Sequence, residues 1–302
     1  MLKYVAFKWA ILFLSPLPLN VGYFLSDRIG DVCYLMARGS RRTVRRNLAQ
    51  VMGPATRRED LDRAARTAFH NISRNYFDLI RLPRLNLDKL SRELTLYHME
   101  HYENALAQKK GVVVVTAHIG NFDFVAQILA ARTQKLTVPV EPLQPERLFR
   151  LVTGLRSSKG LSFLPQGVAG LRTAVRALKQ GETVAVACDR DITGNGCRLN
   201  FMGKEASFPT GAVELALKTG ALIVPAFSVR QPHNRFSLYV EPPLQMIVEG
   251  DRQQTVRENV RQLVSIMERY VRLHPEQWVA AFDVIWDNQG RGPEMASEPV
   301  GV

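Results

Sequence analysis

The chain has 302 residues, of which 46% are hydrophobic and 23% are charged, and this composition excludes a wholly disordered or collagen-like protein. A mean hydropathy of -0.10 excludes a polytopic membrane protein. The formal net charge is +12, and residues 1–100, with 17 basic and 9 acidic side chains, hold most of the excess. Such a basic segment needs an anionic partner, which is nucleic acid, a membrane surface or an acidic substrate.

The three cysteines, Cys33, Cys188 and Cys197, form no C-x-x-C pair and have no regular spacing. An odd number of scattered cysteines is not a disulfide framework, which favours a reduced protein that faces the cytosol. No pattern of histidines and cysteines has the spacing of a zinc site, so we predict no metal centre.

Residues 1–24 are apolar and aromatic apart from a few positions, but Pro16 and Pro18 interrupt them. A membrane-spanning helix needs about 20 continuous apolar residues, and a secretory signal needs a small-residue cleavage site, which does not follow here. The segment therefore favours a helix lying in the membrane interface, or a shallow hairpin that turns at the prolines. Tyr4, Trp9 and Tyr23 would then lie at the level of the lipid headgroups. The alternative is an ordinary helix of the buried core.

A cluster of basic residues follows within nine positions: Arg38, Arg41, Arg42, Arg45 and Arg46. No nucleic-acid fold signature accompanies the cluster, so we predict no nucleic-acid partner. Beside the apolar N-terminus, attraction to anionic lipid explains it better, although a solvated helix face is the alternative. We therefore predict that residues 1–52 are membrane-associating helices.

The remaining residues predict an α/β fold. Apolar residues recur at helical spacing over residues 59–82, and Pro83 ends that helix. Residues 111–117 (GVVVVTA) are a β-branched run typical of a buried parallel strand. Strands and helices then alternate, with strands at 136–140, 183–187, 221–227 and 236–240, the last at a sheet edge, and helices at 122–133, 169–179, 212–218 and 253–273. The alternation predicts a mostly parallel central sheet flanked by helices over residues 53–287, and the composition of residues 288–302 predicts a disordered tail.

A histidine follows the strand at 111–117, in the sequence His118-Ile-Gly-Asn-Phe-Asp123. Open α/β sheets bind their ligands at this end of the strands. Asn121 can cap the next helix, which puts Asp123 in the first turn, where its carboxylate can fold back onto His118. An aspartate on Nδ1 leaves Nε2 free to take a proton from an incoming hydroxyl. With no nucleophilic serine or cysteine beside it, the motif favours direct attack of a substrate alcohol on an activated acyl group; a capping aspartate and a buried histidine are the alternative.

This motif after a GVVVV strand resembles the lipid A biosynthesis acyltransferases (lauroyl and myristoyl transferases) and the related phosphatidylinositol mannoside acyltransferases. Further segments agree in the same order: RRTVRRNL, GLRSSKGLSFLP, the long stretch from LKQGETVAVACDRD to GALIVPAF, and HPEQW. The resemblance covers roughly residues 5–287. Where the lipid A enzymes tend to carry Asp-Gln-Asp, this chain has Asp189-Arg190-Asp191, which looks closer to the mannoside branch.

The resemblance implies a glycerolipid acyltransferase-like fold, with His118 as general base and Asp123 as its partner. It also implies substrate-binding roles for Arg156, Asp189, Asp191 and Glu205. The acyl donor would be a thioester, acyl-CoA or acyl-ACP, and no metal or permanently bound cofactor would be needed. The acceptor would be a hydroxyl of an anionic glycolipid, similar to a phosphatidylinositol mannoside or a lipid A precursor. The protein would act at the cytoplasmic face of the plasma (inner) membrane.

Asp189 and Asp191 also fit two other classes of enzyme. Four apolar residues followed by D-x-D-x-T match a phosphatase of the haloacid dehalogenase type, with Asp189 as nucleophile and Asp191 as acid. The same D-x-D can hold a metal and a nucleotide sugar in a glycosyltransferase. The motif lies late in the chain for the first class, and neither G-x-G-x-x-G nor a P-loop supports a nucleotide site.

Overall fold

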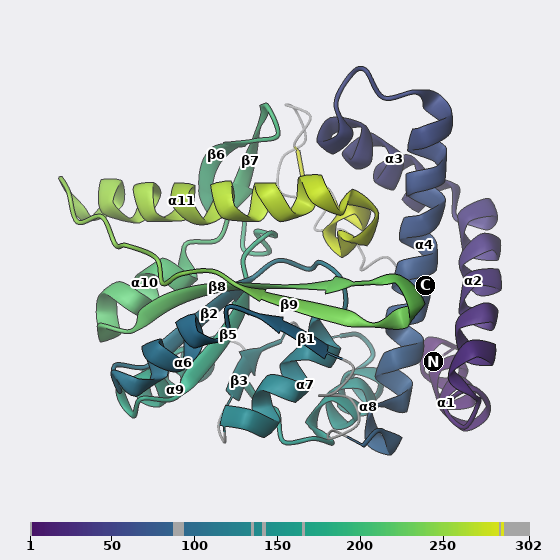
Figure 1. Ribbon diagram of the computed structural model, residues 1–302, viewed down its shortest axis with the longest axis horizontal. Coiled ribbons are helices and arrows are strands. Elements are labelled where there is room, and N and C mark those ends of the chain that lie inside the picture. The colour runs from purple at the N-terminus through teal and green to yellow at the C-terminus, as the bar shows by residue number, and fades with distance from the viewer. Residues whose placement is uncertain are drawn as a thin grey trace.

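The computed structural model of the chain describes residues 2–86, 94–133, 136–140, 143–164, 167–283 and 285–286. Figure 1 shows a central sheet with helices on both faces and a layer of helices from the N-terminus along one end. The tail predicted at residues 288–302 lies outside the described residues.

The central sheet has seven strands in the order β1-β9-β8-β2-β5-β3-β4. Their bounds are β1 Leu94–Tyr97, β2 Val112–Thr116, β3 Leu136–Pro139, β4 Ser162–Leu164, β5 Thr183–Ala187, β8 Leu222–Arg230 and β9 Phe236–Val240. The pairs from β8 to β4 are all parallel, β8 and β9 are antiparallel, and β9 and β1 are parallel. The predicted α/β fold with a mostly parallel sheet is confirmed.

The prediction that residues 236–240 form an edge strand is wrong. β9 lies between β8 and β1, and β1 forms the edge. β1 has only four residues, LTLY, and two of them are exposed. So short a strand, without a buried β-branched run, gives no clear signal in the sequence, and the position of β9 depends on it.

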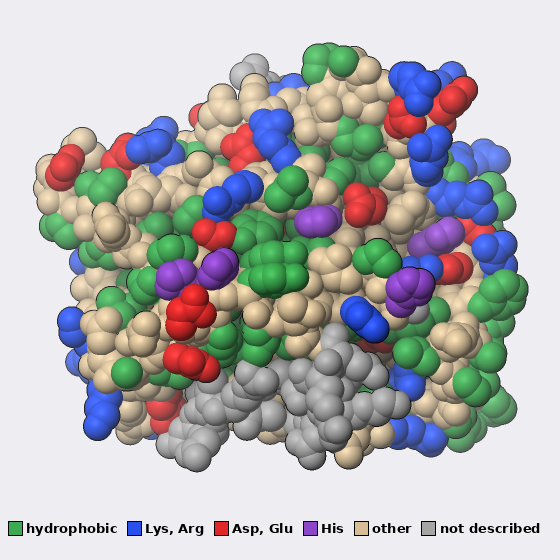
Figure 2. Space-filling model, in the orientation of Figure 1, with side chains coloured by type: hydrophobic (Ala, Val, Ile, Leu, Met, Phe, Trp, Pro, Cys, Tyr) green, Lys and Arg blue, Asp and Glu red, His purple; other side chains and the backbone are tan. Residues whose placement is uncertain are grey.

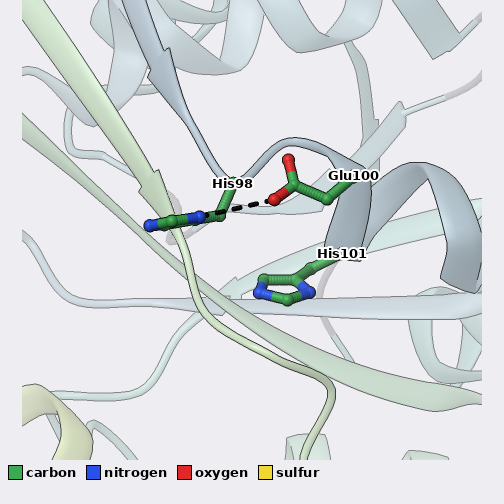
Figure 3. Close-up of side chains that lie close together, drawn as sticks. All are labelled: His98, Glu100 and His101. Atoms are coloured by element: carbon green, nitrogen blue, oxygen red, sulfur yellow. Dashed lines mark hydrogen bonds and ion pairs between the residues drawn. The ribbon is translucent and has the colours of Figure 1, made fainter.

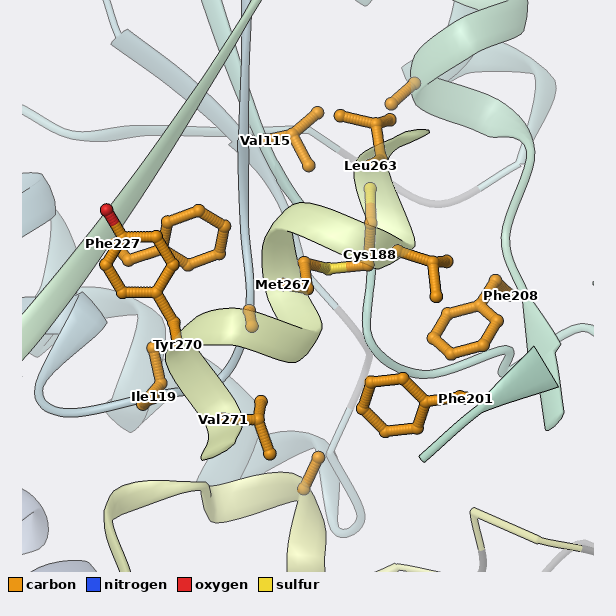
Figure 4. Packing of buried hydrophobic residues seen from close by; sticks show 14 of the residues in the cluster. Val115, Ile119, Cys188, Phe201, Phe208, Phe227, Leu263, Met267, Tyr270 and Val271 are labelled. Carbon is orange, nitrogen blue, oxygen red and sulfur yellow. The ribbon is translucent and has the colours of Figure 1, made fainter. Parts of the chain in front are cut away.

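The strand β2 is covered on both faces. Val113 and Val115 belong to one apolar core, with β8 and the helices α10 (Gly211–Thr219) and α11 (Arg252–Leu273). Figure 4 shows part of this core, in which Val115 and Cys188 belong to the same cluster as Leu263 and Met267 of α11. Val112 and Val114 belong to the second core, with α6 (Glu100–Ala107), α7 (Phe122–Thr133) and α8 (Glu146–Ser157). Each buried valine contributes about 1.5–3 kcal/mol to stability. Because the valines are buried on both faces of the sheet, the strand and its carboxyl end are held in one position.

The N-terminal helices are α1 (Leu2–Leu14), α2 (Leu19–Met36), α3 (Arg38–Met52) and α4 (Arg58–Arg81). A break at residues 15–18, which include Pro16 and Pro18, separates helices α1 and α2. The shallow membrane hairpin, one of the two arrangements expected for this segment, stays a prediction. Helix α2 packs so closely on α4 that a Cβ at Gly22 would lie 1.8 Å from the Phe77 ring. Helix α3 buries Val44 and Leu48 in the same core as the sheet.

The outer face of α1 and α2 exposes large apolar side chains: Val5, Trp9, Leu12, Phe13, Val21, Phe24, Ile29, Val32, Leu35 and Met36. Figure 2 shows hydrophobic side chains along this end of the molecule and basic ones beside α3. In the basic cluster Arg45 pairs with Asp62 at 2.9 Å, whereas Arg42 and Arg46 are exposed. Within the described ranges, no helix has both the length and the apolar character needed to cross a membrane.

Candidate active site

Two neighbouring parallel strands bring His118 and Asp189 together. Thr116 at the end of β2 pairs in register with Ala187 at the end of β5. His118 and Asp189 each follow two residues later, so their side chains meet at the carboxyl edge of the sheet. Nδ1 of His118 lies 2.7 Å from Oδ1 of Asp189, and the backbone N–H of His118 donates to Oδ2 at 2.9 Å.

The carboxylate of Asp189 is buried and accepts a third hydrogen bond. Asp189 is 2% exposed, and Nε1 of Trp278 donates to its Oδ2 at 2.9 Å. Burial raises the pKa of Asp189, but the charge and hydrogen bonds of His118, together with Trp278, outweigh it and hold that pKa below its ordinary value. Asp189 is therefore an ionised acceptor facing three donors.

This geometry assigns the two ring nitrogens of His118. An ionised carboxylate only accepts, so Nδ1 carries the proton that it donates to Asp189. Nε2 is then the nitrogen that can accept a proton from a substrate. The His118 side chain is 21% exposed, and the Phe122 ring packs against it edge-on, with ring centroids 5.0 Å apart. A histidine whose Nδ1 is held by a buried carboxylate in this way can deprotonate a hydroxyl through Nε2.

The predicted partner of His118 needs correction: Asp189, and not Asp123, holds Nδ1. Asn121 does cap the helix α7, because its Oδ1 accepts from the N–H of Phe124 at 3.2 Å. The carboxylate of Asp123, in the first turn, accepts instead from Nη2 of Arg156 at 2.7 Å. Arg156 stands in the last turn of α8. His118 and Asp123 therefore belong to two separate charged pairs, His118 with Asp189 and Asp123 with Arg156.

Arg156 and Asp123 form a partly covered ion pair, with side chains that are 21% and 19% exposed. A guanidinium that is held in place and still reaches solvent can bind an anionic group of a substrate.

Asp191 organises a loop. Its two oxygens accept from Thr193, Gly194, Gly196 and Ser207, which closes the turn before the hairpin of β6 (Cys197–Phe201) and β7 (Lys204–Phe208). Burial raises the pKa of Asp191, but these hydrogen bonds lower it further than burial raises it. Glu205 lies on the hairpin, 61% exposed and 3.4 Å from Arg198. In the part of the chain that the structure describes, neither carboxylate bonds His118.

Trp278 is a residue of the site that the sequence did not single out. It belongs to the HPEQW segment, which entered the argument only as part of a family resemblance. Its indole is 1% exposed, so the hydrogen bond to Asp189 is shielded from water. A buried tryptophan gives no local signal of a polar role, because most such residues only fill a core.

A second cluster of polar side chains, His98, Glu100 and His101, has ligand atoms within 4.8 Å of one another (Figure 3). His98 and Glu100 are 67% and 61% exposed, and the cluster follows β1. Because β1 runs antiparallel to β2, this cluster lies at the opposite edge of the sheet from His118. It is therefore no part of the candidate active site.

Comparison with known proteins identifies the family of this chain. Residues 2–281 match the family described as bacterial lipid A biosynthesis acyltransferase. The chain is 31% identical over 198 residues to the phosphatidylinositol mannoside acyltransferase of Mycolicibacterium smegmatis, covering 64% of each chain. It is 31% identical over 200 residues to that of Mycobacterium tuberculosis (64% of this chain, 62% of the relative). The lipid A biosynthesis lauroyltransferase of Escherichia coli is 26% identical over 197 residues (63% and 61%).

These matches cover less than two thirds of the length of the curated relatives. Among solved structures, the 1-acyl-sn-glycerophosphate acyltransferase of Thermotoga maritima aligns with 83% of this chain and 97% of its own, at a TM-score of 0.39 and 15% identity. The family match over residues 2–281 confirms the family resemblance that the sequence motifs indicated. The chain belongs to the bacterial lipid A biosynthesis acyltransferase family.

Proposed function

We propose that this protein is a membrane-associated O-acyltransferase. It moves a long-chain acyl group from a thioester, acyl-CoA or acyl-ACP, to a hydroxyl of an anionic glycolipid that resembles a phosphatidylinositol mannoside or a lipid A precursor. The observation that carries the proposal is the pairing of His118 with the buried carboxylate of Asp189. Family membership supports the reaction class, and the named relatives support a glycolipid as the acceptor.

The proposed reaction begins with His118. Nε2 removes the proton of the acceptor hydroxyl as its oxygen attacks the thioester carbonyl, and Asp189 stabilises the imidazolium that forms. The tetrahedral intermediate collapses by breaking the carbon–sulfur bond. The imidazolium then returns the proton to the departing thiolate, so His118 ends each cycle neutral. The products are an ester and a free thiol, and the balance needs neither an oxidant nor a metal.

Arg156 is proposed to bind the phosphate of the acceptor. Its guanidinium bonds Asp123 at 2.7 Å through Nη2, which keeps the side chain in one orientation near the start of α7. A planar guanidinium matches a phosphate with two parallel hydrogen bonds. Stabilising the oxyanion of the tetrahedral intermediate is the other role open to this residue, and kinetics of variants separate the two.

The apolar face of α1 and α2 is proposed to lie on the membrane. Trp9, Leu12 and Phe24 are each more than half exposed, which costs free energy in water and is relieved in lipid. Basic side chains of α3 stand beside this face and attract anionic lipid by about 1 kcal/mol each. An inner-membrane glycolipid and an intracellular thioester would meet at the cytoplasmic face, where we propose that the enzyme acts.

The geometry gives no support to a phosphatase or a D-x-D glycosyltransferase. A nucleophilic Asp189 would need to approach a phosphorus atom, but it is 2% exposed and faces three donors. The oxygens of Asp191 are taken by its own loop.

The test is transfer of radiolabelled palmitate in detergent by the purified chain and by His118→Ala. Palmitoyl-CoA and palmitoyl-ACP are each offered with water alone, a phosphatidylinositol mannoside, a lipid A precursor or a lysophospholipid. We expect label in one glycolipid, with the variant lowering the rate by a factor of about 10²–10⁴. A His118→Ala enzyme that keeps the wild-type rate would exclude His118 as the base. Absence of both transfer and thioester hydrolysis with every donor would contradict the reaction class.

A further inference from the structure

The loop that carries His118 is held by a dense set of hydrogen bonds. The carbonyl of His118 accepts from the N–H of Val279 at 2.7 Å, and that of Ile119 accepts from Ser228 Oγ at 2.9 Å. Gly120 donates its N–H to the carbonyl of Gln277 at 3.1 Å. It has a φ of +62°, and a Cβ there would lie 2.4 Å from the carbonyl oxygen of Ser228. The loop is therefore seated directly on β8 and on the residues around Gln277.

Helix α4 also holds this loop. Nδ2 of Asn75 donates to the carbonyl of Gly120 at 2.6 Å. One turn further, Oδ2 of Asp78 accepts from Nδ2 of Asn121 at 2.8 Å. Since Asn121 also caps α7, the bond to Asp78 fixes both the end of the loop and the start of the helix that carries Asp123.

Asp78 and Arg230 form a buried ion pair at the centre of these contacts. They are 3% and 7% exposed, and Nη2 of Arg230 lies 2.7 Å from Oδ2 of Asp78. Nη2 of Arg230 also donates to Oδ1 of Asn75 at 2.8 Å. Oδ1 of Asp78 accepts from the hydroxyl of Tyr23 on α2 at 2.6 Å. Burial and the charge of Asp78 raise the pKa of Tyr23, so its hydroxyl stays a donor.

Stability alone does not explain a charged pair in this position. Apolar residues of similar volume often stabilise a core as well as a buried ion pair does, because both charges must be desolvated. Here the polar atoms are directed at the loop: Asp78 binds Asn121, and Arg230 orients Asn75, which binds Gly120. The backbone N–H and carbonyl of Arg230 also form two hydrogen bonds with the side-chain amide of Gln277. The backbone carbonyl of Gln277 in turn accepts from the N–H of Gly120.

We propose that Asp78 and Arg230 are positioning residues for His118. Their buried ion pair sets the path of residues 118–121 and thereby the position of the imidazole relative to the two substrates. Tyr23 extends the cluster to α2, so the ion pair joins α2, α4, β8 and the loop. The proposal rests on the proposed role of His118 as base. A misplacement of a reacting group by about 1 Å is enough to lower a rate by roughly a hundredfold.

The test compares Asp78→Asn and Arg230→Met with Asp27→Asn in the full-length chain in detergent. Asp27 is a matched control, because it pairs with Arg74 at 2.6 Å and joins the same two helices without a recorded contact to the loop. We expect Asp78→Asn and Arg230→Met to lower kcat by about ten- to a hundredfold, with KM for donor and acceptor changed by no more than about threefold. Asp27→Asn should keep kcat within about threefold.

Amide hydrogen exchange of the peptide that contains Gly120 gives a readout independent of turnover. Exchange should be faster in Asp78→Asn than in the wild type, and unchanged in Asp27→Asn. If Asp78→Asn does not fold, Tyr23→Phe removes one donor to Asp78, and exchange of the Gly120 peptide should still be faster in this variant than in the wild type and in Asp27→Asn. Equal kcat for the Asp78 and Asp27 variants, or unchanged exchange of the loop, would overturn the proposal. If instead His118→Ala stays active while loop exchange still rises in Asp78→Asn, the role of His118 as base has failed and the loop contact stands.

Discussion

Asp189 holds His118 at two points, with one carboxylate oxygen on the imidazole Nδ1 at 2.7 Å and the other on the backbone N–H at 2.9 Å. The ring and its own peptide are thus fixed by one side chain. This double contact follows from the in-register pairing of β2 and β5, because both residues stand two positions beyond their strands.

Replacing Asp189 with asparagine should disable the site without changing its volume. All three groups that bond the carboxylate are donors, so the amide nitrogen of an asparagine would face a donor in either orientation. The imidazole then loses the ionised acceptor that fixes its tautomer. We expect kcat to fall by a factor of about 10²–10⁴ in the transfer assay. Asp191→Asn is the control, since it changes the hairpin loop and not His118. An equal loss in both variants would contradict the assignment of Asp189.

Arg156→Lys should weaken binding of the acceptor. The lysine keeps the charge but loses the planar pair of donors, and a lost hydrogen bond to a charged group costs about 1.5–3 kcal/mol, or roughly 10- to 150-fold in KM for the anionic glycolipid. Arg150→Lys on the same helix is the control, because Arg150 is 72% exposed and its ion pair is with the exposed Glu146. A fall in kcat at saturating acceptor, with KM unchanged, would assign Arg156 to the oxyanion instead.

Acid should destabilise the fold partly through Asp189 and Asp191. Both have a pKa in the folded protein below the ordinary value of 3.8. Between these two values the unfolded chain binds more protons, so the stabilisation is complete above the unfolded pKa and is lost as the pH falls through the folded one. We expect the free energy of unfolding, measured with urea, to decline below about pH 5, and Asp191→Asn to decline less than the wild type. Parallel curves for the two proteins would show that Asp191 does not contribute.

Membrane binding should be visible in the fluorescence of one tryptophan. The chain has three tryptophans, and Trp9 is 55% exposed whereas Trp278 and Trp286 are 1% and 7% exposed. Vesicles with anionic lipid should shift the emission to shorter wavelengths, and Trp9→Phe should abolish the shift. Leu12→Ser combined with Phe24→Ser should weaken binding by about tenfold or more, since each apolar side chain contributes roughly 1.5–3 kcal/mol when fully buried. Binding that is unaffected by this double variant would place the membrane contact elsewhere.

The family motifs and the strongest elements could be predicted from the sequence. Residues 112–116 and 183–187 are runs of small and β-branched residues, and the helix Phe122–Thr133 has its cap in Asn121. These signals lie within a few residues of one another, so no knowledge of distant contacts is needed. The same local rule placed His118 at the carboxyl end of a buried strand, where the structure pairs it with Asp189. Pro16 and Pro18 also indicated the break between α1 and α2, because prolines act on their own backbone.

What the sequence could not decide was which side chains meet. Asp123 lies five positions from His118, but Asp189, 71 positions away, holds the imidazole because β5 is the neighbour of β2. The partner of Asp123 is Arg156 for the same kind of reason, since α8 packs beside α7. The edge position of β1, the indole of Trp278 and the ion pair of Asp78 with Arg230 also depend on strand order and helix packing. The periodicity of apolar residues determines each helix or strand and its buried face. A hydrogen bond between two elements depends on which elements are neighbours, and only the folded sheet decides that.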